Sequence, residues 1–356
     1  MSRERLIEVT ERGLYCAVGK FHIDPWRPVD RAVVTHAHSD HATWGCEHYL
    51  ASKVGVPILA QRVHQGADIT GLDYGETTTI NGVKVSLHPA GHLLGSAQVR
   101  VEHAGRVEVV SGDYKVTPDG TCEPFEVVRC DRFITESTFG LPIYRWGPDE
   151  AWADDLLDWW RGNAEAGQTT VVFAYALGKA QRVLHTVAER AKQQGQALPG
   201  GGAIVCHGSV QRFNELYAEA GVAMPATQTS TEASRQACKG RGLVVAPPSV
   251  LGTTWLRRFA PYRTAFASGW MHIRGNRRRR GVDRGFVVSD HADWPGLLQT
   301  IRDTGCESVG VTHGYTQVLV RYLREQGIDA DVVPTRYEGE SEEGASRQEA
   351  GDAEET

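Results

Sequence analysis

The sequence Thr35-His36-Ala37-His38-Ser39-Asp40-His41 decides how this chain is interpreted. Four metal-binding side chains fall within six consecutive residues, directly after the apolar run Ala32-Val33-Val34, which predicts a buried strand that ends where the cluster begins. His36 and His38 are two residues apart, so in extended chain both point the same way and can reach one cation. Asp40 and His41 follow once the chain turns and suit a second cation nearby. Imidazole and carboxylate ligands favour zinc or manganese over calcium.

Length and charge describe the molecule around this cluster. A chain of 356 residues predicts two domains, and its apolar fraction of 41% is ample for a sizeable core. Residues 338–356 hold eight acidic residues and one arginine, a balance of −7 that exceeds the formal charge of −6 of the whole chain, and they predict a disordered acidic tail. The remainder is close to neutral, which allows a polyanionic substrate provided that arginines gather on one face.

The sequence also predicts a compartment. Its charged start leads into no apolar signal core, and no run of eighteen apolar residues occurs, so we expect neither secretion nor a membrane span. The seven cysteines are scattered and form no Cys-x-x-Cys pair, which predicts reduced thiols in a cytoplasmic protein and assigns none of them to metal.

The pattern of apolar residues changes near position 147. Before it we expect short strands with a helical segment at 57–64 and a helix beginning at 42–44; the strands are 6–9, 14–18, 21–24, 31–35, 49–51, 83–87, 97–101 and 107–110. After a helix that starts at Pro148, strands and helices alternate, which predicts a parallel sheet flanked by helices. The expected elements there are strands 170–175, 203–206, 243–246 and 264–268 and helices 179–192 and 210–220. Strand 285–288, helix 294–304, strand 308–312 and helix 316–326 complete the chain.

Three more candidate ligands follow predicted strands or stand beside glycines. His92 lies in Pro89-Ala90-Gly91-His92, Asp113 follows a strand in Val110-Ser111-Gly112-Asp113, and His313 follows the strand at 308–312. The ends of strands are where α/β sheets place their chemistry. Taken singly, each residue is explained as well by a loop, a turn or a helix start, so their order and context carry the prediction.

In this order the motifs resemble those of the metallo-β-lactamase superfamily. The resemblance rests on His-x-His-x-Asp-His at 36–41, Pro-x-Gly-His at 89–92 and Ser-Gly-Asp at 111–113. Residues 135–140 (TESTFG), 289–293 (SDHAD) and 311–314 (VTHG) resemble motifs A, B and C of its β-CASP nuclease branch, and residues 176–181 resemble a helix opening inside the β-CASP insert. The match covers nearly all of residues 1–336. A narrower resemblance, to bacterial ligase-associated DNA exonucleases, rests on residues 268–271, the arginine run after them, and residues 289–294.

The resemblance implies a fold and its domains. We expect an α/β protein consisting of a metallo-β-lactamase αββα sandwich with an inserted β-CASP α/β domain. The sandwich would comprise residues 1–145 and 269–337, the insert residues 146–268, and the acidic tail residues 338–356.

The resemblance also implies a metal-dependent nuclease. His36, His38, His92 and Asp113 would hold one divalent metal ion, zinc or manganese, and Asp40, His41, Asp113 and His313 a second. Together the ions would generate a hydroxide that attacks phosphorus. His291 would be the general acid, with Glu136 holding its other N–H and keeping the imidazolium charged. The expected products are a 5′-phosphate and a 3′-hydroxyl.

Substrate contacts are expected from basic residues and helix starts. Arg274, Arg277, Arg278, Arg279, Arg280 and Arg284 form the strongest basic cluster, and guanidinium groups suit phosphates. A solvated arginine loop is the alternative interpretation. Lys179 and Ser209 open predicted helices whose N–H groups could bind phosphate, although ordinary capping accounts for them equally well.

Other functions remain open at this point. The narrower resemblance favours a DNA exonuclease in repair, with a DNA ligase or repair machinery as partner, whereas a histidine in motif C is typical of RNA-processing members. A small-molecule hydrolase of the lactamase or glyoxalase type would need only the first metal motifs. A non-catalytic binding subunit is disfavoured because no ligand position is substituted.

Overall fold

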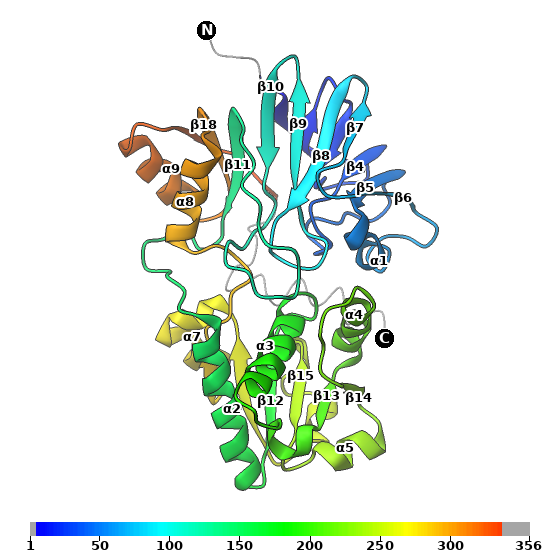
Figure 1. The fold of residues 1–356 in the computed structure, drawn as a ribbon, viewed down its shortest axis with the longest axis vertical. Helices are drawn as coiled ribbons and strands as arrows, with labels where there is room; N and C mark the ends of the chain where they lie inside the picture. Colours follow the sequence, from blue (N-terminus) through cyan, green and yellow to red (C-terminus); the bar gives the residue numbers. More distant parts are fainter. Residues whose placement is uncertain (1–4, 337–356) are drawn as a thin grey trace. The chain divides into compact units, whose positions relative to one another are not determined.

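The structure, a computed structural model, describes residues 5–336, apart from the side chain of Arg277. These residues form two compact units, each with its own core (Figure 1). The first unit comprises residues 5–118, 122–145 and 291–336, and the second comprises residues 119–121 and 146–290. The predicted acidic tail lies outside the described residues.

The first unit contains two sheets. The first has the strand order β1-β2-β3-β4-β5-β6. Its strands are β1 (Ile7–Thr10), β2 (Gly13–Cys16), β3 (Phe21–Ile23), β4 (Arg31–Val33), β5 (His48–Ser52) and β6 (Asp68–Leu72). The second has the order β19-β18-β11-β10-β9-β8-β7. Its strands are β7 (Thr77–Ile80), β8 (Val83–Pro89), β9 (Ala97–His103), β10 (Arg106–Val110), β11 (Arg132–Ser137), β18 (Ser308–Gly314) and β19 (Asp329–Val332).

Apolar side chains join the two sheets into a sandwich. Phe21 and Val33 from the first sheet share one buried cluster with Val85 and Val99 from the second, because alternate residues of a strand face the same side. The other face of the second sheet is covered by helices α8 (Trp294–Thr304) and α9 (Thr316–Glu325), which lie beside β18 and β11 (Figure 1). The short helix α1 (Val56–Leu59) packs against β5 and β6. This is the mixed α/β architecture that the motifs predict.

The second unit is built on a parallel sheet with the order β14-β13-β15-β12-β16-β17. The strands are β12 (Thr169–Phe173), β13 (Ile204–Cys206), β14 (Gln228–Thr229), β15 (Leu243–Ala246), β16 (Tyr262–Ala267) and β17 (Arg284–Phe286). Helices α2 (Asp149–Glu165) and α3 (Lys179–Gln193) bury Leu156, Trp160 and Val183 against Val172 and Val245 of the sheet. The neighbouring strand residues Val171 and Val244 are equally buried, as expected for a parallel sheet covered on both faces. The remaining helices are α4 (Gly208–Glu219), α5 (Glu232–Cys238), α6 (Thr254–Arg257) and α7 (Arg274–Arg280).

Several local predictions were wrong. No helix begins at 42–44, because Tyr49 Oη donates to the Thr43 carbonyl and accepts from Cys46 N–H, which holds this backbone in turns. The helix expected at 57–64 is only α1, and strands β6, β7 and β11 were not expected. Residues 269–290, expected in the first domain, group with the second unit because β17 pairs with β16.

Two further findings concern cysteines and membranes. No disulfide forms among residues 5–336. In the same range, no helix has the length and apolar content required to cross a membrane.

Candidate metal centre

Parallel strand pairing brings the candidate ligands of the first unit together. β10, β11 and β18 are neighbours with parallel pairing, so their carboxyl ends meet at one edge of the sheet. Asp113 follows β10, Glu136 lies near the end of β11, and His313 lies near the end of β18. The sequence motifs at these strand ends therefore converge although they are far apart in the chain.

Two backbone features aim these side chains. Gly112 has a φ of +57°, and a Cβ there would lie 2.7 Å from Thr35 Cβ, so a glycine is required before Asp113. His313 has a φ of +54°, which is unfavourable by about 1–2 kcal/mol for an L-residue. It is the extra residue of a bulge: Glu136 pairs with Thr312, whereas Ser137 pairs with Gly314. The Ser137 hydroxyl donates to the His313 carbonyl and holds the bulge in place.

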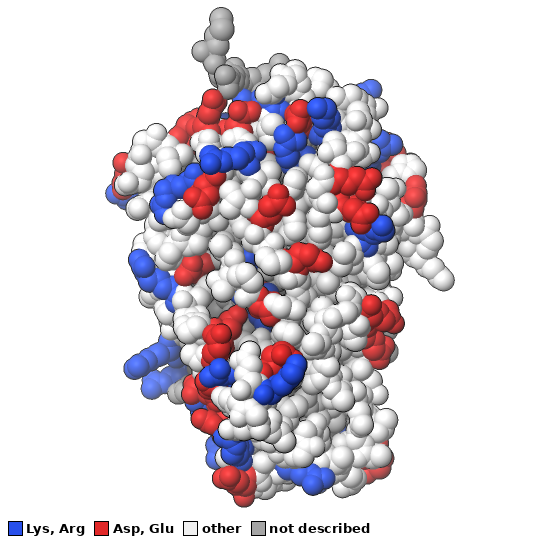
Figure 2. Space-filling model, in the orientation of Figure 1, with Lys and Arg blue, Asp and Glu red and all other residues white. Residues whose placement is uncertain are grey.

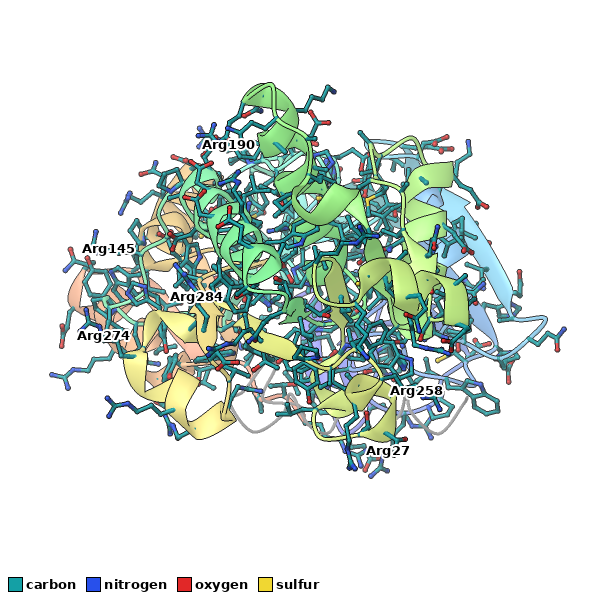
Figure 3. The ribbon with its side chains drawn as sticks, turned by 90° about the horizontal axis from the view of Figure 1, so that it is seen from below. Arg27, Arg145, Arg190, Arg258, Arg274 and Arg284 are labelled. Carbon is teal, nitrogen blue, oxygen red and sulfur yellow. The ribbon has the colours of Figure 1, made fainter. Side chains whose placement is uncertain are left out.

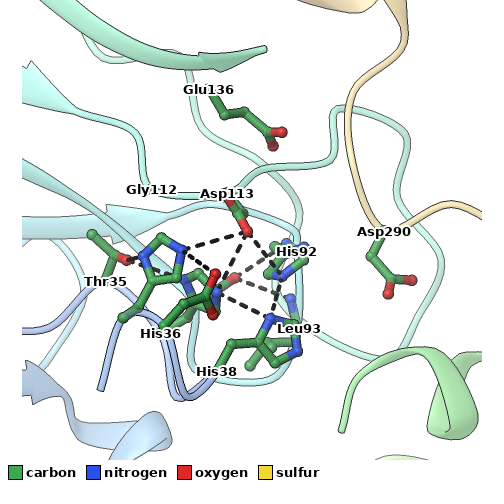
Figure 4. A network of polar contacts seen from close by, with 12 residues as sticks. Thr35, His36, His38, His92, Leu93, Gly112, Asp113, Glu136 and Asp290 are labelled. Atoms are coloured by element: carbon green, nitrogen blue, oxygen red, sulfur yellow. Dashed lines mark hydrogen bonds and ion pairs between the residues drawn. The ribbon is translucent and has the colours of Figure 1, made fainter. Parts of the chain in front are cut away.

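The first predicted ligand set forms one cluster. His38 Nδ1 lies 3.1 Å from His36 Nε2 and 3.2 Å from His92 Nε2. Asp113 Oδ2 lies 3.7 Å from His36 Nε2 and 3.9 Å from His92 Nε2 (Figure 4). Nitrogens that share a tetrahedral zinc at about 2.0–2.1 Å are roughly 3.3 Å apart. One ligand atom from each of the four residues lies within 4.8 Å of the others. Their spacing therefore fits a single cation.

The second predicted set shares Asp113 with the first. His41 Nε2 lies 3.7 Å from Asp113 Oδ2, and His313 Nδ1 lies 3.6 Å from Asp113 Oδ1. These three residues form a second group of possible ligands. Asp40 Oδ2 lies 3.7 Å from His41 Nε2, but Asp40 falls outside the 4.8 Å group. Oδ2 of Asp113 thus lies near nitrogens of both sets, whereas Oδ1 lies near His313.

Hydrogen bonds fix which ring nitrogens of His36 and His41 face the cluster. Thr35 Oγ1 donates its proton to Asp24 Oδ2 at 2.6 Å, so it can only accept from His36 Nδ1 at 3.1 Å. Asp24 Oδ2 also accepts from His41 Nδ1 at 2.7 Å. In the neutral rings, both Nε2 atoms therefore direct a lone pair toward Asp113.

The chemistry of the donors fits divalent metal ions. Asp40 Oδ1, His41 Nε2, Asp113 Oδ1 and His313 Nδ1 are buried without a hydrogen-bond partner in the described part of the chain. Leaving such atoms unsatisfied costs about 1–3 kcal/mol each, and more for charged groups. A divalent ion satisfies several of them at once, and the mixture of imidazole and carboxylate suits zinc or manganese.

The protonation equilibria show the same demand for positive charge. Burial lowers the pKa of His36 well below its usual value, so its ring is neutral. Burial also opposes charge on His41, but the carboxylates of Asp40, Asp113 and Asp24 raise its pKa to about 10. Although burial alone would raise the pKa of Asp113, the surrounding histidines, His41 foremost, hold it well below its usual range. The cluster thus attracts positive charge. A proton on His41 supplies one such charge, and a divalent metal ion would supply more.

A histidine–glutamate pair lies beside the cluster. His291 Nδ1 is 2.8 Å from Glu136 Oε2 and 3.0 Å from Glu136 Oε1, and both side chains are buried. Glu136 Oε1 also accepts from Tyr114 N–H at 2.7 Å, which fixes the carboxylate. The His291 ring lies 4.8 Å from that of His92. The carboxylate therefore holds Nδ1–H, and the Nε2 edge is the one that can deliver a proton.

Asp24 is a site residue that sequence reasoning missed. It binds Thr35 N–H at 2.8 Å, the Thr35 hydroxyl and His41 Nδ1, so it orients one ligand and the start of the metal loop. Its φ of +44° directs the carboxylate to this position. The available signal was an aspartate at the end of the strand expected at 21–24, next to the strand that carries the histidines.

Lys179 and Ser209 differ from the expected phosphate contacts. Lys179 is fully buried, and its Nζ lies 3.0 Å from Asp290 Oδ2. Ser209 is also buried; its backbone N–H and its hydroxyl both lie at His207 Nδ1, which caps α4. Both residues are therefore occupied within the second unit, and capping explains Ser209.

The arginine run divides into paired and unpaired side chains. Arg279 bonds to Asn276, Arg280 lies 4.2 Å from the centroid of the Phe266 ring, and Arg284 pairs with Asp155 at 3.1 Å. Arg274 and Arg278 are exposed on α7. The side chain of Arg277 lies outside what the structure describes.

Comparisons with known proteins follow the same motifs. No protein-family model matches the chain. It is 29% identical over 320 residues, 89% of its length, to a protein of Opitutus terrae named "Probable DNA ligase". It is 34% identical over 119 residues to "Endoribonuclease ysh-1" of Neurospora crassa, 33% of this chain, and 31% identical over 133 residues to "Transcription termination factor FttA" of Pyrococcus horikoshii, 36% of this chain. Through these relatives the chain is similar to β-CASP nucleases of the metallo-β-lactamase superfamily.

The chain spans only a part of these relatives. The aligned regions cover 30%, 14% and 20% of the three proteins. Among solved structures, a protein of unknown function from Enterococcus faecalis has a TM-score of 0.55 at 12% identity, covering 86% of this chain and 79% of that one. The last comparison concerns the fold alone.

Proposed function

We propose that this β-CASP protein uses two divalent metal ions to hydrolyse phosphodiester bonds of nucleic acid, and that its substrate is DNA digested from an end during repair. The observation that carries the proposal is the buried His291–Glu136 pair within reach of Asp113, which together form a group of atoms within 4.8 Å. A hydrolase of the lactamase or glyoxalase type would need only the metal ligands. The added pair supplies a proton donor for a poor leaving group, the 3′ oxygen of a nucleotide.

The residues have separate roles in the proposed reaction. His36, His38, His92 and Asp113 would hold one ion, and Asp40, His41, Asp113 and His313 the other. When bound, the ions supply a water of lowered pKa and neutralise charge on the phosphate. His291 Nε2 gives a proton to the leaving 3′ oxygen as its bond to phosphorus breaks. Glu136 keeps the ring oriented through Nδ1–H. Because the leaving 3′ oxygen takes the proton, the products are a 3′-hydroxyl and a 5′-phosphate.

RNA is the second candidate substrate. It is favoured by His313 at the motif C position and by relatives that are named endoribonucleases. The experiment that distinguishes DNA from RNA also distinguishes zinc from manganese. It likewise distinguishes digestion from an end from internal cleavage.

The test uses end-labelled single- and double-stranded DNA and RNA, each incubated with zinc, manganese or magnesium. We expect the DNA to be shortened from an end in zinc or manganese, leaving 5′-phosphates. Nitrocefin and a thioester are incubated in parallel. Turnover of either small molecule without cleavage of any nucleic acid would refute the proposal.

We further propose that the protein acts in the cytoplasm together with a DNA ligase. The support is the relative named as a ligase, which aligns with most of this chain. Repair of a duplex with a damaged end should be faster with both proteins than with the ligase alone. Equal rates would contradict this partnership.

A further inference from the structure

Two arginines of α7 differ from the basic side chains around them. Arg279, Arg280 and Arg284 have partners within the second unit, as described above. Among the described residues, Arg274 and Arg278 have neither a hydrogen-bond nor an ion-pair partner, and both are exposed. Figure 3 shows Arg274 projecting outward from α7, and blue side chains protrude beside this helix in Figure 2. Arg274 and Arg278 are therefore the described arginines of α7 whose guanidinium groups are not held by another side chain.

Their spacing places them side by side on the helix. Residues four apart occupy one face, and like charges at that spacing destabilise a helix. No acidic residue occurs in α7, whose sequence is RGNRRRR. The helix thus lacks a counter-charge of its own, and an anion from outside would stabilise it.

Both arginines line one pocket. Its volume is about 540 Å³, and Met271, Gly275 and Gly285 complete its lining. Pockets that hold small organic ligands measure about 300–1,000 Å³. The side chain of Met271, which is largely buried, provides an apolar wall. A Cβ on Gly285 would lie 2.8 Å from Met271 Sδ, so the glycine lets that side chain pack closely.

We propose that this pocket binds a short segment of single-stranded nucleic acid, with Arg274 and Arg278 each on a backbone phosphate and a base against Met271. This inference rests on the proposed function and adds a binding site to it. Guanidinium groups match phosphate oxygens in pairs, and a thioether packs well on aromatic rings. An acidic peptide would satisfy the arginines but offers no flat ring for the apolar wall, which favours the nucleotide.

The first test removes charge inside and outside the pocket by equal amounts. The double variant Arg274→Gln/Arg278→Gln is compared with Arg263→Gln/Arg161→Gln, whose arginines pair with Asp283 and Asp158. Binding of a fluorescein-labelled phosphorothioate oligothymidylate, which resists hydrolysis, is measured by anisotropy at several salt concentrations. We expect the pocket variant to raise Kd at least about tenfold. Its slope of log K against log salt should fall by about 1.4, since each arginine neutralises one phosphate of a single strand.

The second test fills the pocket without changing charge. Gly275 is exposed, and a Cβ there would have no neighbour within 4 Å, so Gly275→Leu can fold while occupying the pocket. Gly162→Leu is the matched control, because Gly162 is an exposed glycine of α2 with no neighbour within 4 Å. We expect weaker binding for Gly275→Leu and wild-type binding for Gly162→Leu.

The outcomes separate the pocket from the reaction. Equal Kd values for the pocket variants and their controls would overturn the binding site, whatever the hydrolysis assays show. So would a wild-type protein that fails to bind the oligothymidylate. Wild-type binding that weakens as expected supports the site even if no nucleic acid is hydrolysed, and in that case the proposed function alone fails.

Discussion

Two clusters of buried charged side chains in this protein balance their charges differently. In the second unit, Lys179 lies 3.0 Å from Asp290, and Arg182 lies 2.6 Å from Asp119 and 3.4 Å from Asp290. Arg182 also donates to the Ser289 carbonyl at 2.7 Å. Two cations thus face two anions, with all four side chains almost fully buried.

The metal-binding cluster of the first unit has no such balance. Within residues 5–336, the partners of its carboxylates are histidines, a hydroxyl and backbone amides, and none is a lysine or arginine; the carboxylates are those of Asp24, Asp40, Asp113 and Glu136. A cluster that contains its own counter-ions is a complete structural element. A cluster of carboxylates and imidazoles attracts cations from outside, and this difference separates a self-contained charged cluster from a candidate metal site.

The largest expected effect comes from the shared carboxylate. Asp113→Asn should lose metal and turnover together, by at least about a thousandfold, because metal ions supply several kcal/mol and each 1.36 kcal/mol is a factor of ten. The metal-free variant should be no more stable than the metal-free wild type, because the surrounding histidines, His41 foremost, hold the pKa of Asp113 well below its usual range and so stabilise its carboxylate. Elemental analysis, turnover and thermal unfolding measure these effects. Asp68→Asn, at an exposed ion pair with His48, is the control. Full metal content in Asp113→Asn would break the comparison.

In the second unit the main effect is expected on the free energy of unfolding. Lys179→Met leaves a buried carboxylate with one cation fewer, which should lower the free energy of unfolding by about 3–5 kcal/mol. Denaturant unfolding measures it. Lys53→Met is the matched control, because its ion pair with Asp73 is about two-thirds exposed and solvent screens such a pair, so its loss should change stability little. Equal stability of the two variants would show that the buried cluster is not structural.

A smaller effect is expected at the proton donor. His291→Ala should retain its metal, because the ring is in neither predicted ligand set, but should turn over about a hundredfold more slowly. Metal content and single-turnover cleavage of a labelled oligonucleotide measure the two properties separately. Cleavage at the wild-type rate would refute the role as general acid.

The smallest expected effect concerns Asp24. Asp24→Asn replaces the carboxylate that holds His41 Nδ1–H, and loss of such an orienting partner typically weakens metal affinity by about 10–100-fold. Calorimetric titration with zinc or manganese measures the affinity. Asp329→Asn, at an exposed aspartate that begins β19, should bind as the wild type does. An unchanged affinity in Asp24→Asn would show that Thr35 alone positions the loop.

The candidate metal ligands could be predicted from the sequence, because their residue types and spacing are typical of metal sites. Asp113 and the histidines at 36, 38, 41, 92 and 313 come together because each lies at or just past the end of a strand of one sandwich. Asp24 was missed because its role depends on a left-handed backbone and on β3 lying beside β4. Lys179 was misassigned because burial of a lysine is decided by Asp290, more than a hundred positions away. Local sequence patterns could not predict which distant segments of the chain contact each other.

The bulge at His313 has one more consequence. Ser137 already has Gly314 as its pairing neighbour, so the ladder between β11 and β18 does not use His313 at all. Deleting His313 should let β11 and β18 pair without a bulge. The deletion should also remove one ligand of the second ion. The shortened chain should still fold. Comparing its cleavage rate with that of the wild type would then measure what the second ion contributes to the reaction.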